Sequence, residues 1–483
     1  MVIWRYFKGV SRWTYQALSK PANAMAIGGG LFLVVLLSTI ALLGHRSLWL
    51  DEFFSIHFAA PDLPFAKALS DSIATDSQPP LYYGLLHFWL SWFGDGAAAV
   101  RSLNLLGFPM LAGAMAISWR MPLPRPAWLL FWCLLLTSRF TWDFITEARA
   151  YFLAISAGSL LAVLTYDMTL AIGDKRAMPP WQIVVFALAA IVASTLHYYG
   201  FIFAGSLIAV LFIDALIERR LGTAGIFAAI GALVLGIEIG WLAYSLPRLW
   251  FDPNGFWLTF APVRETRLFI TNAFSSNVVV LVLLALAAVT GFRNILKDRP
   301  IIVLVAAICL GYLAVVALSL RQPILYHRYL SLFLPALMLA TTLILMRAMP
   351  KTAVLPVFLS VFLVSLPIAI ARALPDREDW RGSNAYVESH YGPECETARI
   401  MMFGSGSSNV ILTYLANGRD WASVRFDQKG YDEALSTTCP VVGWANTMAV
   451  RDVSQTLATI DLRGRHVEII PFKGVALIVR GQP

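Results

Sequence analysis

IIVLVAAICLGYLAVVALS, residues 301 to 319, contains neither a charged residue nor a proline. As an α-helix, 19 residues would rise about 28 Å. The hydrocarbon layer of a bilayer is ~30 Å thick, so this run has the length of a transmembrane helix. Runs of similar length and composition occupy residues 24 to 44 and 352 to 371. The sequence therefore predicts an α-helical protein that crosses a membrane several times.

The composition of the whole chain agrees with this interpretation. Of 483 residues, 58% are hydrophobic and 14% are charged, whereas soluble domains are about half apolar and about a quarter charged. Disorder, collagen-like structure and an ordinary cytosolic enzyme are excluded. The net charge of +8 would suggest a nucleic-acid partner in a soluble protein. Here most basic residues fall in short loops, where they orient helices, and no nucleic-acid partner is expected.

Apolar windows separated by basic loops predict about eleven spans, and no cleavable signal peptide is expected. They lie near residues 24–44, 97–119, 127–146, 150–170, 181–199, 201–217, 224–246, 275–292, 301–319, 329–346 and 352–371. The basic segment before the first span places the N-terminus in the cytosol. Every even-numbered loop is then cytosolic and carries lysine or arginine, and the odd number of spans puts the C-terminal tail outside.

The segment LYYGLLHFWLSWFG, residues 81 to 94, is apolar but short. Fourteen residues rise only about 21 Å as a helix, and counting this segment as a span would move every later basic loop outside. We therefore expect a helix that lies at the outer interface. Tyr82, Tyr83, Trp89 and Trp92 would then face the lipid headgroups.

Three pieces of the chain are expected outside the membrane: loops 45–96 and 247–274, and the tail 372–483. The tail has strand-like runs at residues 398–403, 441–444, 466–471 and 475–479, and helix-like runs at 407–417 and 450–460. This alternation predicts a small extracytoplasmic α/β domain after a transmembrane module of residues 1 to 371. Cys395 and Cys439 each precede a predicted strand in an oxidising location and are a candidate disulfide.

Charged residues at the outer ends of the spans are the candidate site. Asp51 and Glu52 are adjacent carboxylates directly after the first span, and helix capping is the alternative interpretation. Gln78 precedes two prolines that begin the interfacial helix. Glu147 and Arg149 lie between the third and fourth spans, where a buried ion-pair network or a functional site would explain them equally well.

Two further clusters are predicted at the same surface. His197 and Tyr198 lie between the fifth and sixth spans, and Arg321, His327 and Arg328 precede the tenth. The satisfied interface residue is the simpler interpretation of an isolated histidine. Arginine is disfavoured on the outer side of a membrane, so a carboxylate or an anionic ligand should hold Arg328 there.

Taken in order, these motifs resemble a known family. They are SLWLDEFFS, QPPLYYGLLHFWLSWFG, AVRSLNLLG, EARAYFL, HYYGF, HRYLSLFLPAL and, in the tail, REDWRGSNAYV. The set is similar to that of the bacterial C-type (GT-C) membrane glycosyltransferases, which include protein O-mannosyltransferases and aminoarabinose transferases. The resemblance implies a polytopic GT-C-like fold in the bacterial cytoplasmic membrane.

The resemblance also implies an activity: inverting transfer of a hexosyl or pentosyl group from a polyprenyl-phosphate carrier to a glycan, lipid or protein acceptor on the periplasmic face. Asp51 matches the catalytic carboxylate of the family, and Glu147 matches its second, supporting carboxylate. Gln78 departs from the family, whose members often carry His or Lys there. Glu52, Arg149, His197 and Tyr198 would support the reaction, and Arg328, His327, Arg321 and Gln78 would contact the donor phosphate.

The chemistry is consistent with this assignment. A carboxylate that accepts the proton of an acceptor hydroxyl contributes about 10² to 10⁴ in rate. A lipid phosphate leaves as a stable anion, so no general acid is required, in contrast to glycosidases. Arginines would stabilise the charge that grows on the phosphate. A divalent ion such as Mg²⁺ or Mn²⁺, if the reaction needs one, would lie between Asp51 and Glu147.

Several alternatives stay open at this level. A transporter or lipid flippase also has many helices and few buried charges, although such proteins place binding groups near the midplane. A non-catalytic relative that binds the carrier is a second alternative. Trp257, Arg264 and Arg267 in loop 247–274 belong either to a lid over the donor or to an interfacial aromatic belt. The sequence names neither the sugar nor the acceptor.

Overall fold

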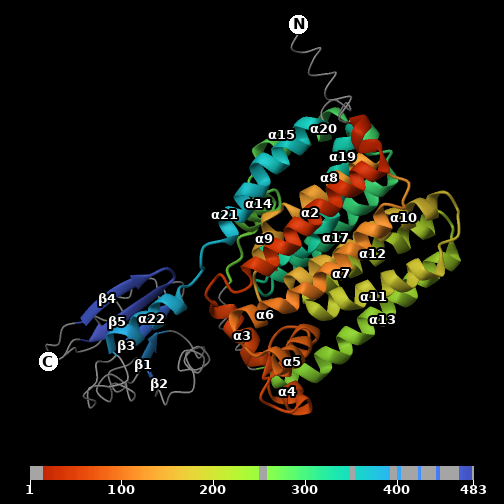
Figure 1. Cartoon of the computed structure of the whole chain (residues 1–483). Coiled ribbons are helices and arrows are strands. Elements are labelled where there is room, and N and C mark those ends of the chain that lie inside the picture. The colour runs from red at the N-terminus through yellow and green to blue at the C-terminus, as the bar shows by residue number, and fades with distance from the viewer. Residues whose placement is uncertain are drawn as a thin grey trace, which may run out of the picture.

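The computed structural model describes residues 15–249, 258–348, 354–391, 400–403, 423–425, 442–446 and 467–480. Within them the chain is a bundle of helices followed by a small sheet (Figure 1). The longer helices are α2 (Pro21–Leu42), α10 (Tyr151–Gly173), α11 (Pro180–Leu196), α12 (Tyr198–Ile217), α13 (Leu221–Ser245) and α17 (Arg299–Ser319). The α7 (Gly107–Ser118), α8 (Arg125–Leu136), α14 (Pro262–Ala273), α15 (Val278–Thr290) and α19 (Leu334–Ala348) helices are shorter.

Shorter helical segments connect or extend these elements. They are α3 (Leu50–Ala59), α4 (Phe65–Asp71), η1 (Ile73–Thr75), α5 (Leu81–Phe93), α6 (Ala97–Ser102), η2 (Leu103–Leu106), α9 (Arg139–Ile145), η3 (Leu246–Arg248), α16 (Phe292–Ile295), α18 (His327–Leu330), η5 (Ser331–Phe333), α20 (Val354–Ser360), the π-helical turn η7 (Val361–Ser365), α21 (Leu366–Ala373) and α22 (Trp380–Tyr391). Several continue one another, so that α6, η2 and α7 together form one apolar rod from Ala97 to Ser118.

The predicted spans correspond to helices, although not all to simple ones. In the described residues, eight helices are long and apolar enough to cross a membrane. The predicted span 275–292 belongs to a bent pair, α14 and α15, which meet at 107°. The spans predicted at 127–146 and 181–199 are shorter helices, α8 and α11, of 12 and 17 residues. The polytopic membrane fold is confirmed, and three of the eleven spans are short or broken.

The core of the bundle is organised around α10. Within its most apolar stretch, 89% of residues are buried inside the protein, and it packs against α7, α11, α12, α17 and α19. The short α8 is also enclosed, since Trp128, Phe131 and Trp132 are completely buried. By contrast, α2 is mostly exposed, as expected for a helix whose apolar side chains face lipid.

The basic loops predicted on one side of the membrane meet at one end of the bundle, which we call the basic end. Arg299, the first residue of α17, forms ion pairs of 2.7 Å with Asp214 and with Glu218 at the end of α12. Arg220 donates to the carbonyl oxygens of Ala171 and Arg176. The alternation of loops inferred from charge is thus reproduced in the packing of the helices.

The opposite end of the bundle, which we call the site end, carries α3 to α6 (Figure 1). Helix α5 coincides with the segment expected at the membrane interface. The expectation for its aromatic residues was wrong for Tyr82 and Tyr83, which are buried, whereas Trp92 is 73% exposed and its contact with headgroups stays a prediction. Those two side chains point into the protein because the α5 face that carries them packs against α3 and the core.

The tail forms a five-stranded sheet in the order β2-β1-β3-β5-β4. Its strands are β1 (Ile400–Phe403), β2 (Ser423–Arg425), β3 (Val442–Asn446), β4 (Val467–Phe472) and β5 (Val475–Arg480). The β1 strand pairs in parallel with β2 and β3, and β5 pairs antiparallel with β3 and β4. Four strands match predicted ones, β2 was not predicted, and the predicted helices at 407–417 and 450–460 lie outside the described residues.

The sheet contacts the site end through a small apolar cluster. Trp380 of α22, Trp444 of β3 and Val475 of β5 pack with Leu48 and Phe53 of the first loop, and all five are buried. Figure 1 shows the sheet and α22 next to α3 and α6. The division of the chain at residue 371 stays a prediction, because this cluster joins the two parts.

Candidate functional site

Asp51 lies in the first turn of α3, at the site end of the bundle. The side chain is partly exposed, and among the described residues it forms no ion pair and no side-chain hydrogen bond. Its main-chain oxygen accepts hydrogen bonds from Arg149 Nη1 at 3.3 Å and from Ser55 Oγ at 3.1 Å. The carboxylate is therefore held in place by its helix while its oxygens stay available.

Glu52, its neighbour, has a structural role. The side chain is completely buried and binds Arg101 through two hydrogen bonds of 2.7 Å. It also accepts from the backbone nitrogens of Trp49 and Ala148. Such a bidentate pair is among the stronger polar contacts in proteins. Glu52 thus joins three segments around Asp51. It supports the site by holding these segments in place and not by contact with a substrate.

The segment 376–381, DREDWR, also holds α3, and we call it the strap. Glu378 Oε2 accepts from Leu50 N at 2.8 Å, and Asp376 Oδ1 accepts from Ser47 N at 2.6 Å. Arg381 Nη2 donates to the carbonyl oxygen of Arg46 at 3.0 Å. Asp376 and Arg381 thus bind the backbone that precedes α3, and Glu378 accepts the N–H of its first residue, which has no acceptor within the helix.

No role was predicted for the strap from the sequence, although most of it belongs to the quoted motif REDWRGSNAYV. Its residues stand more than 300 positions from the backbone groups that they bind. One sequence feature could have indicated its role: charged residues are dense directly after the last predicted span.

Glu147 lies at the centre of an arginine cluster. Its buried carboxylate forms ion pairs with Arg328 and with Arg377 of the strap, the latter at 3.0 Å. Burial by itself would raise the pKa of Glu147, but the two guanidinium groups outweigh it and hold the pKa below its ordinary value. The Arg328 guanidinium also stacks over Trp49, 4.8 Å from the ring centre.

This arrangement answers the question that the sequence raised about Arg328. A carboxylate holds it on that surface, so the ion-pair interpretation of Glu147 and Arg328 is supported. Neither side chain lines the nearby pocket.

Arg149 differs from Arg101, Arg328 and Arg377, the arginines of the site end that pair with carboxylates. Among the described residues no carboxylate pairs with it, and its Nη1 has only long contacts of 3.3 to 3.5 Å with Asp51 O, Ser55 Oγ and Tyr83 OH. The Tyr83 hydroxyl donates in turn to Asp76 Oδ2 at 2.6 Å. Arginine is always charged in proteins, so this guanidinium is a cation whose hydrogen-bonding capacity is mostly unused.

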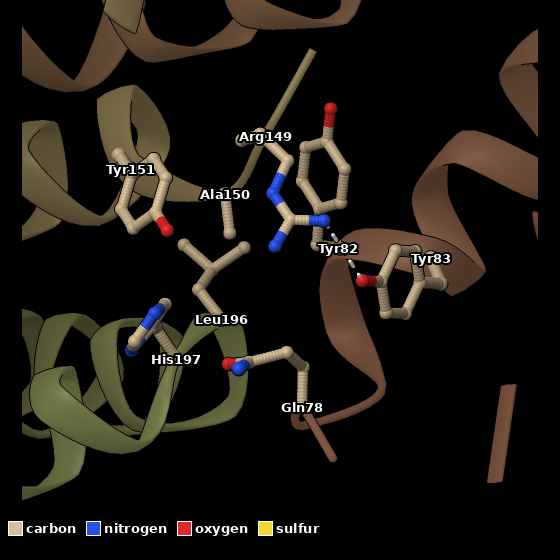
Figure 2. Close-up of a pocket in the computed structure, with 8 residues that line it drawn as sticks. All are labelled: Gln78, Tyr82, Tyr83, Arg149, Ala150, Tyr151, Leu196 and His197. Carbon is tan, nitrogen blue, oxygen red and sulfur yellow. Dashed lines mark hydrogen bonds between the residues drawn. The ribbon is translucent and has the colours of Figure 1, made fainter. Parts of the chain in front are cut away.

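Arg149 lines a small pocket with Gln78, Tyr82, Tyr83, Ala150, Tyr151, Leu196 and His197 (Figure 2). Three polar atoms of this lining are buried and without a hydrogen-bond partner: Gln78 Oε1, Tyr82 OH and His197 Nε2. Buried polar atoms in proteins are normally paired. Their coincidence in one pocket marks it as a binding site for a polar group.

The chain between α11 and α12 places His197 in this pocket. The residue is extended, and its Nδ1 accepts the backbone N–H of Tyr199 at 3.1 Å as the N-cap of α12. Gly200 makes the tight connection possible, since a β-carbon there would meet the carbonyl oxygen of Ala193 at 1.9 Å. Because Nδ1 is an acceptor, the neutral ring carries its proton on Nε2 and offers it to the pocket.

The remaining predicted residues lie elsewhere. His327 binds Glu265 of α14 through its Nδ1 at 2.7 Å, and Arg264 pairs with the same carboxylate. Arg321 and Arg267 are exposed, and no ion pair involves them in the described part of the chain. Tyr198 faces Glu238, Trp241 and Ser245 of α13 instead of the pocket. Trp257, Cys395 and Cys439 lie outside the described residues.

Glu238 is buried in α13, and neither of its oxygens has a hydrogen-bond partner in the described residues. No group of three or more His, Cys, Asp or Glu side chains in the described segments could hold a metal ion. Glu147 is already bound by two arginines, so the pair Asp51 and Glu147 does not fit a divalent ion, and no step is derived through one.

No family model and no curated protein matches the sequence. Among solved structures, the chain is similar to ArnT from Cupriavidus metallidurans, both bound to undecaprenyl phosphate and in the apo state. The identities are 14% and 13%, and each match covers 93% of this chain and 97% of ArnT with a TM-score of 0.57. The resemblance found in the motifs is thus confirmed in three dimensions, and the chain has the fold of ArnT.

Proposed function

We propose that the protein is a membrane glycosyltransferase that moves a sugar from a polyprenyl-phosphate carrier to an acceptor, with inversion. Its fold supports this, because ArnT, which shares that fold, has been crystallised with undecaprenyl phosphate. The motifs that resemble the GT-C family support it independently. The acceptor is a glycan, a lipid or a protein of the cell envelope.

The observation that carries the proposal is that one available carboxylate, Asp51, lies beside one available guanidinium, Arg149. In the described residues neither the Asp51 carboxylate nor the Arg149 guanidinium forms an ion pair, and Arg149 Nη1 lies 3.3 Å from the main-chain oxygen of Asp51. The carboxylates of Glu52 and Glu147 are already bound, the first by Arg101 and the second by Arg328 and Arg377. A general base and a phosphate-binding group are the two parts that this transfer requires.

The reaction balances with these two groups. The Asp51 carboxylate accepts the proton of an acceptor hydroxyl, and the hydroxyl oxygen bonds to the anomeric carbon of the sugar. The bond from that carbon to the phosphate oxygen breaks, and its electron pair leaves with the polyprenyl phosphate. Arg149 stabilises the phosphate as its charge grows. Attack opposite the leaving group inverts the anomeric centre.

Glu147 has a supporting part in this scheme. It orients Arg328 and Arg377 and keeps their positive charges close to the pocket without blocking Arg149. Gln78 and Arg328 remain proposed contacts of the donor phosphate. Arg328 would reach the phosphate only after a change of its side-chain conformation. We expect the site to face the periplasm, with the N-terminus in the cytosol and the sheet outside.

Replacement of Asp51 tests the proposal. Asp51→Asn removes the base but keeps the size of the side chain, so transfer from a lipid-linked donor should fall about 10² to 10⁴-fold. Binding of undecaprenyl phosphate should persist, because Arg149 is unchanged. Asp62→Asn is the matched control, since Asp62 lies in the same loop but is exposed.

Three outcomes would count against the proposal. Full transfer activity in Asp51→Asn would remove Asp51 from its role. Binding of undecaprenyl phosphate without any transfer by the wild type, over a panel of donors and acceptors, would favour a carrier-binding protein. Movement of the carrier across a vesicle membrane that survives Asp51→Asn would favour a flippase.

A further inference from the structure

Tyr151 is a residue of the site end that has no part in the reaction proposed above. It is the first residue of α10, its side chain is buried, and it lines the pocket beside Arg149. Its hydroxyl forms no hydrogen bond with the described residues. Figure 2 shows this hydroxyl directed toward the space between Arg149 and His197. Polar groups of buried side chains are normally paired, so an unpaired phenol group here indicates a missing ligand.

The neighbours of the Tyr151 ring hold it in one position. The ring centre lies 4.5 Å from that of Phe144, 5.3 Å from that of His197 and 6.2 Å from that of Tyr329. The Arg328 guanidinium lies over the same ring, 5.4 Å from its centre. The hydroxyl is therefore in place before a ligand arrives, and binding need not order it.

Three other groups of the pocket can donate hydrogen bonds. His197 Nε2 is buried without a partner in the described structure, and it carries the ring proton because Nδ1 accepts the N–H of Tyr199. Arg149 Nη1 has only the long contacts of 3.3 to 3.5 Å already described. The Gln78 amide has an unpartnered Oε1, and a half-turn of the amide presents the two donors of Nε2 instead. Hydrogen-bond donors thus dominate the lining.

The charge and the size of the pocket indicate which group these donors would bind. None of the eight lining residues is acidic, and Arg149 is positively charged. Asp76 lies near the lining, but its carboxylate accepts the hydroxyl of Tyr83. The space admits about one water-sized group. A single phosphate oxygen has this size, accepts more than one hydrogen bond and carries negative charge, so it suits both the donors and the cation.

We infer that the Tyr151 hydroxyl and His197 Nε2 donate hydrogen bonds to one oxygen of the carrier phosphate, which Arg149 binds from the same pocket. The inference rests on the proposed function, and it adds two neutral donors to the single cation named there. When the bond to the sugar breaks, negative charge moves onto the phosphate. Donors that are already in place stabilise this charge without rearrangement, as in an oxyanion hole. Tyr151 is then a phosphate-binding residue and not only part of the aromatic packing.

Binding of two lipids to the purified full-length protein in detergent tests this inference. The probes are undecaprenyl phosphate and undecaprenol, which share the polyprenyl chain and differ in the phosphate. Tyr151→Phe keeps the ring and its packing but removes the hydroxyl. The affinity for undecaprenyl phosphate should fall about tenfold, as expected for a hydrogen bond to a charged group, and the affinity for undecaprenol should not change. An equal change for both lipids, or no change for either, would overturn the inference.

Tyr166→Phe is the matched control for the loss of a tyrosine hydroxyl. Tyr166 lies on the same helix, about 22 Å further along, where its hydroxyl donates to the carbonyl oxygen of Pro122 at 3.3 Å. Its removal should leave both affinities unchanged. A similar loss of affinity for undecaprenyl phosphate in this control would contradict a specific role of Tyr151.

A second variant tests the other donor. His197→Asn keeps a side-chain oxygen that can cap α12, but it lacks the ring nitrogen that reaches the pocket. It should also weaken undecaprenyl phosphate about tenfold and leave undecaprenol unchanged; a folded variant with unchanged affinities would contradict the inference for His197.

The wild type separates the inference from the proposed function. If the wild type does not bind undecaprenyl phosphate more tightly than undecaprenol, the proposed function is wrong. If it does, and Tyr151→Phe retains the full preference, only the inference is wrong.

Discussion

The arginines at the two ends of the helix bundle differ in the number of carboxylates that pair with them. At the basic end, Arg299 has two carboxylates of its own, and Arg347 pairs with Asp298. At the site end, Arg328 and Arg377 share the single carboxylate of Glu147, and Arg149 has none in the described residues. The acids that could have paired with them are used elsewhere, since Asp376 and Glu378 of the strap accept backbone N–H groups.

This difference separates structural charge from charge that is available to a ligand. At the basic end, the ion pairs of Arg299 and Arg347 hold loops together. The site end keeps a guanidinium and a carboxylate unpaired within one cluster, at a cost in desolvation that a substrate would offset. Functional sites often retain such unsatisfied groups. Variants at the two ends of the bundle test this contrast.

Loss of Glu147 should have the largest effect on stability. Glu147→Gln leaves Arg328 and Arg377 near each other without a carboxylate, and breaking a buried pair in this way typically costs about 3 to 5 kcal/mol. The measurement is resistance to unfolding by SDS in mixed micelles. A loss below about 1 kcal/mol would mean that solvent already screens the cluster.

The same variant predicts a pH effect. The pKa of Glu147 is held below its ordinary value near 4.5, so its contribution to stability is fully present above that value and is lost as the pH falls through the folded pKa. The wild type should therefore lose more stability than Glu147→Gln on acidification below about pH 4.5. Parallel pH curves for the two proteins would contradict this assignment.

Loss of Arg149 should have the next largest effect, on binding rather than on stability. Arg149→Met keeps much of the apolar stem but removes the charge, so affinity for undecaprenyl phosphate should fall about 100-fold, as expected for a charged hydrogen-bonding partner. The free energy of unfolding should hardly change, because no carboxylate loses its partner. A strong loss of stability with unchanged affinity would place Arg149 among the structural charges.

Loss of the Glu378 carboxylate should reduce the rate about tenfold, because misplacement of a catalytic group costs rate even when binding is intact. Glu378→Ala removes the acceptor for Leu50 N, at the start of the helix that carries Asp51. The turnover number should fall while the KM for the donor stays similar. Glu378→Gln retains an acceptor oxygen and should restore most of the rate; if it does not, Glu378 has some other role.

The smallest effect is expected at the basic end. Asp298→Asn removes the partner of Arg347, a side chain that is 64% exposed, while an asparagine can still cap α17. Exposed pairs contribute about 0 to 1 kcal/mol, so stability should change by no more than that. Transfer and carrier binding should be unaffected. An effect as large as that of Glu147→Gln would remove the distinction between the two ends.

Much of the fold could be predicted because the bilayer sets the length of a span. The predictions were confirmed where one helix covers the full thickness of the bilayer, as in residues 301 to 319. They missed the bend between α14 and α15, and they missed that α8 is short and buried by its neighbours. Hydropathy reports how apolar a segment is, but whether lipid or protein surrounds it depends on the rest of the bundle.

For the site, the sequence determined which charged and polar residues lie at one surface, because alternating loops of a polytopic chain must fall on alternate sides. The sequence therefore indicated that one surface carries the candidate site residues Asp51, Glu147, Arg149, His197 and Arg328. How their charges are paired depends on the tertiary structure. Glu147 meets Arg328 and Arg377 from segments 181 and 230 residues away, and in the described residues no carboxylate forms an ion pair with Arg149. Electrostatic partners are set by distances of a few ångströms between side chains, and no local pattern in the sequence encodes such distances.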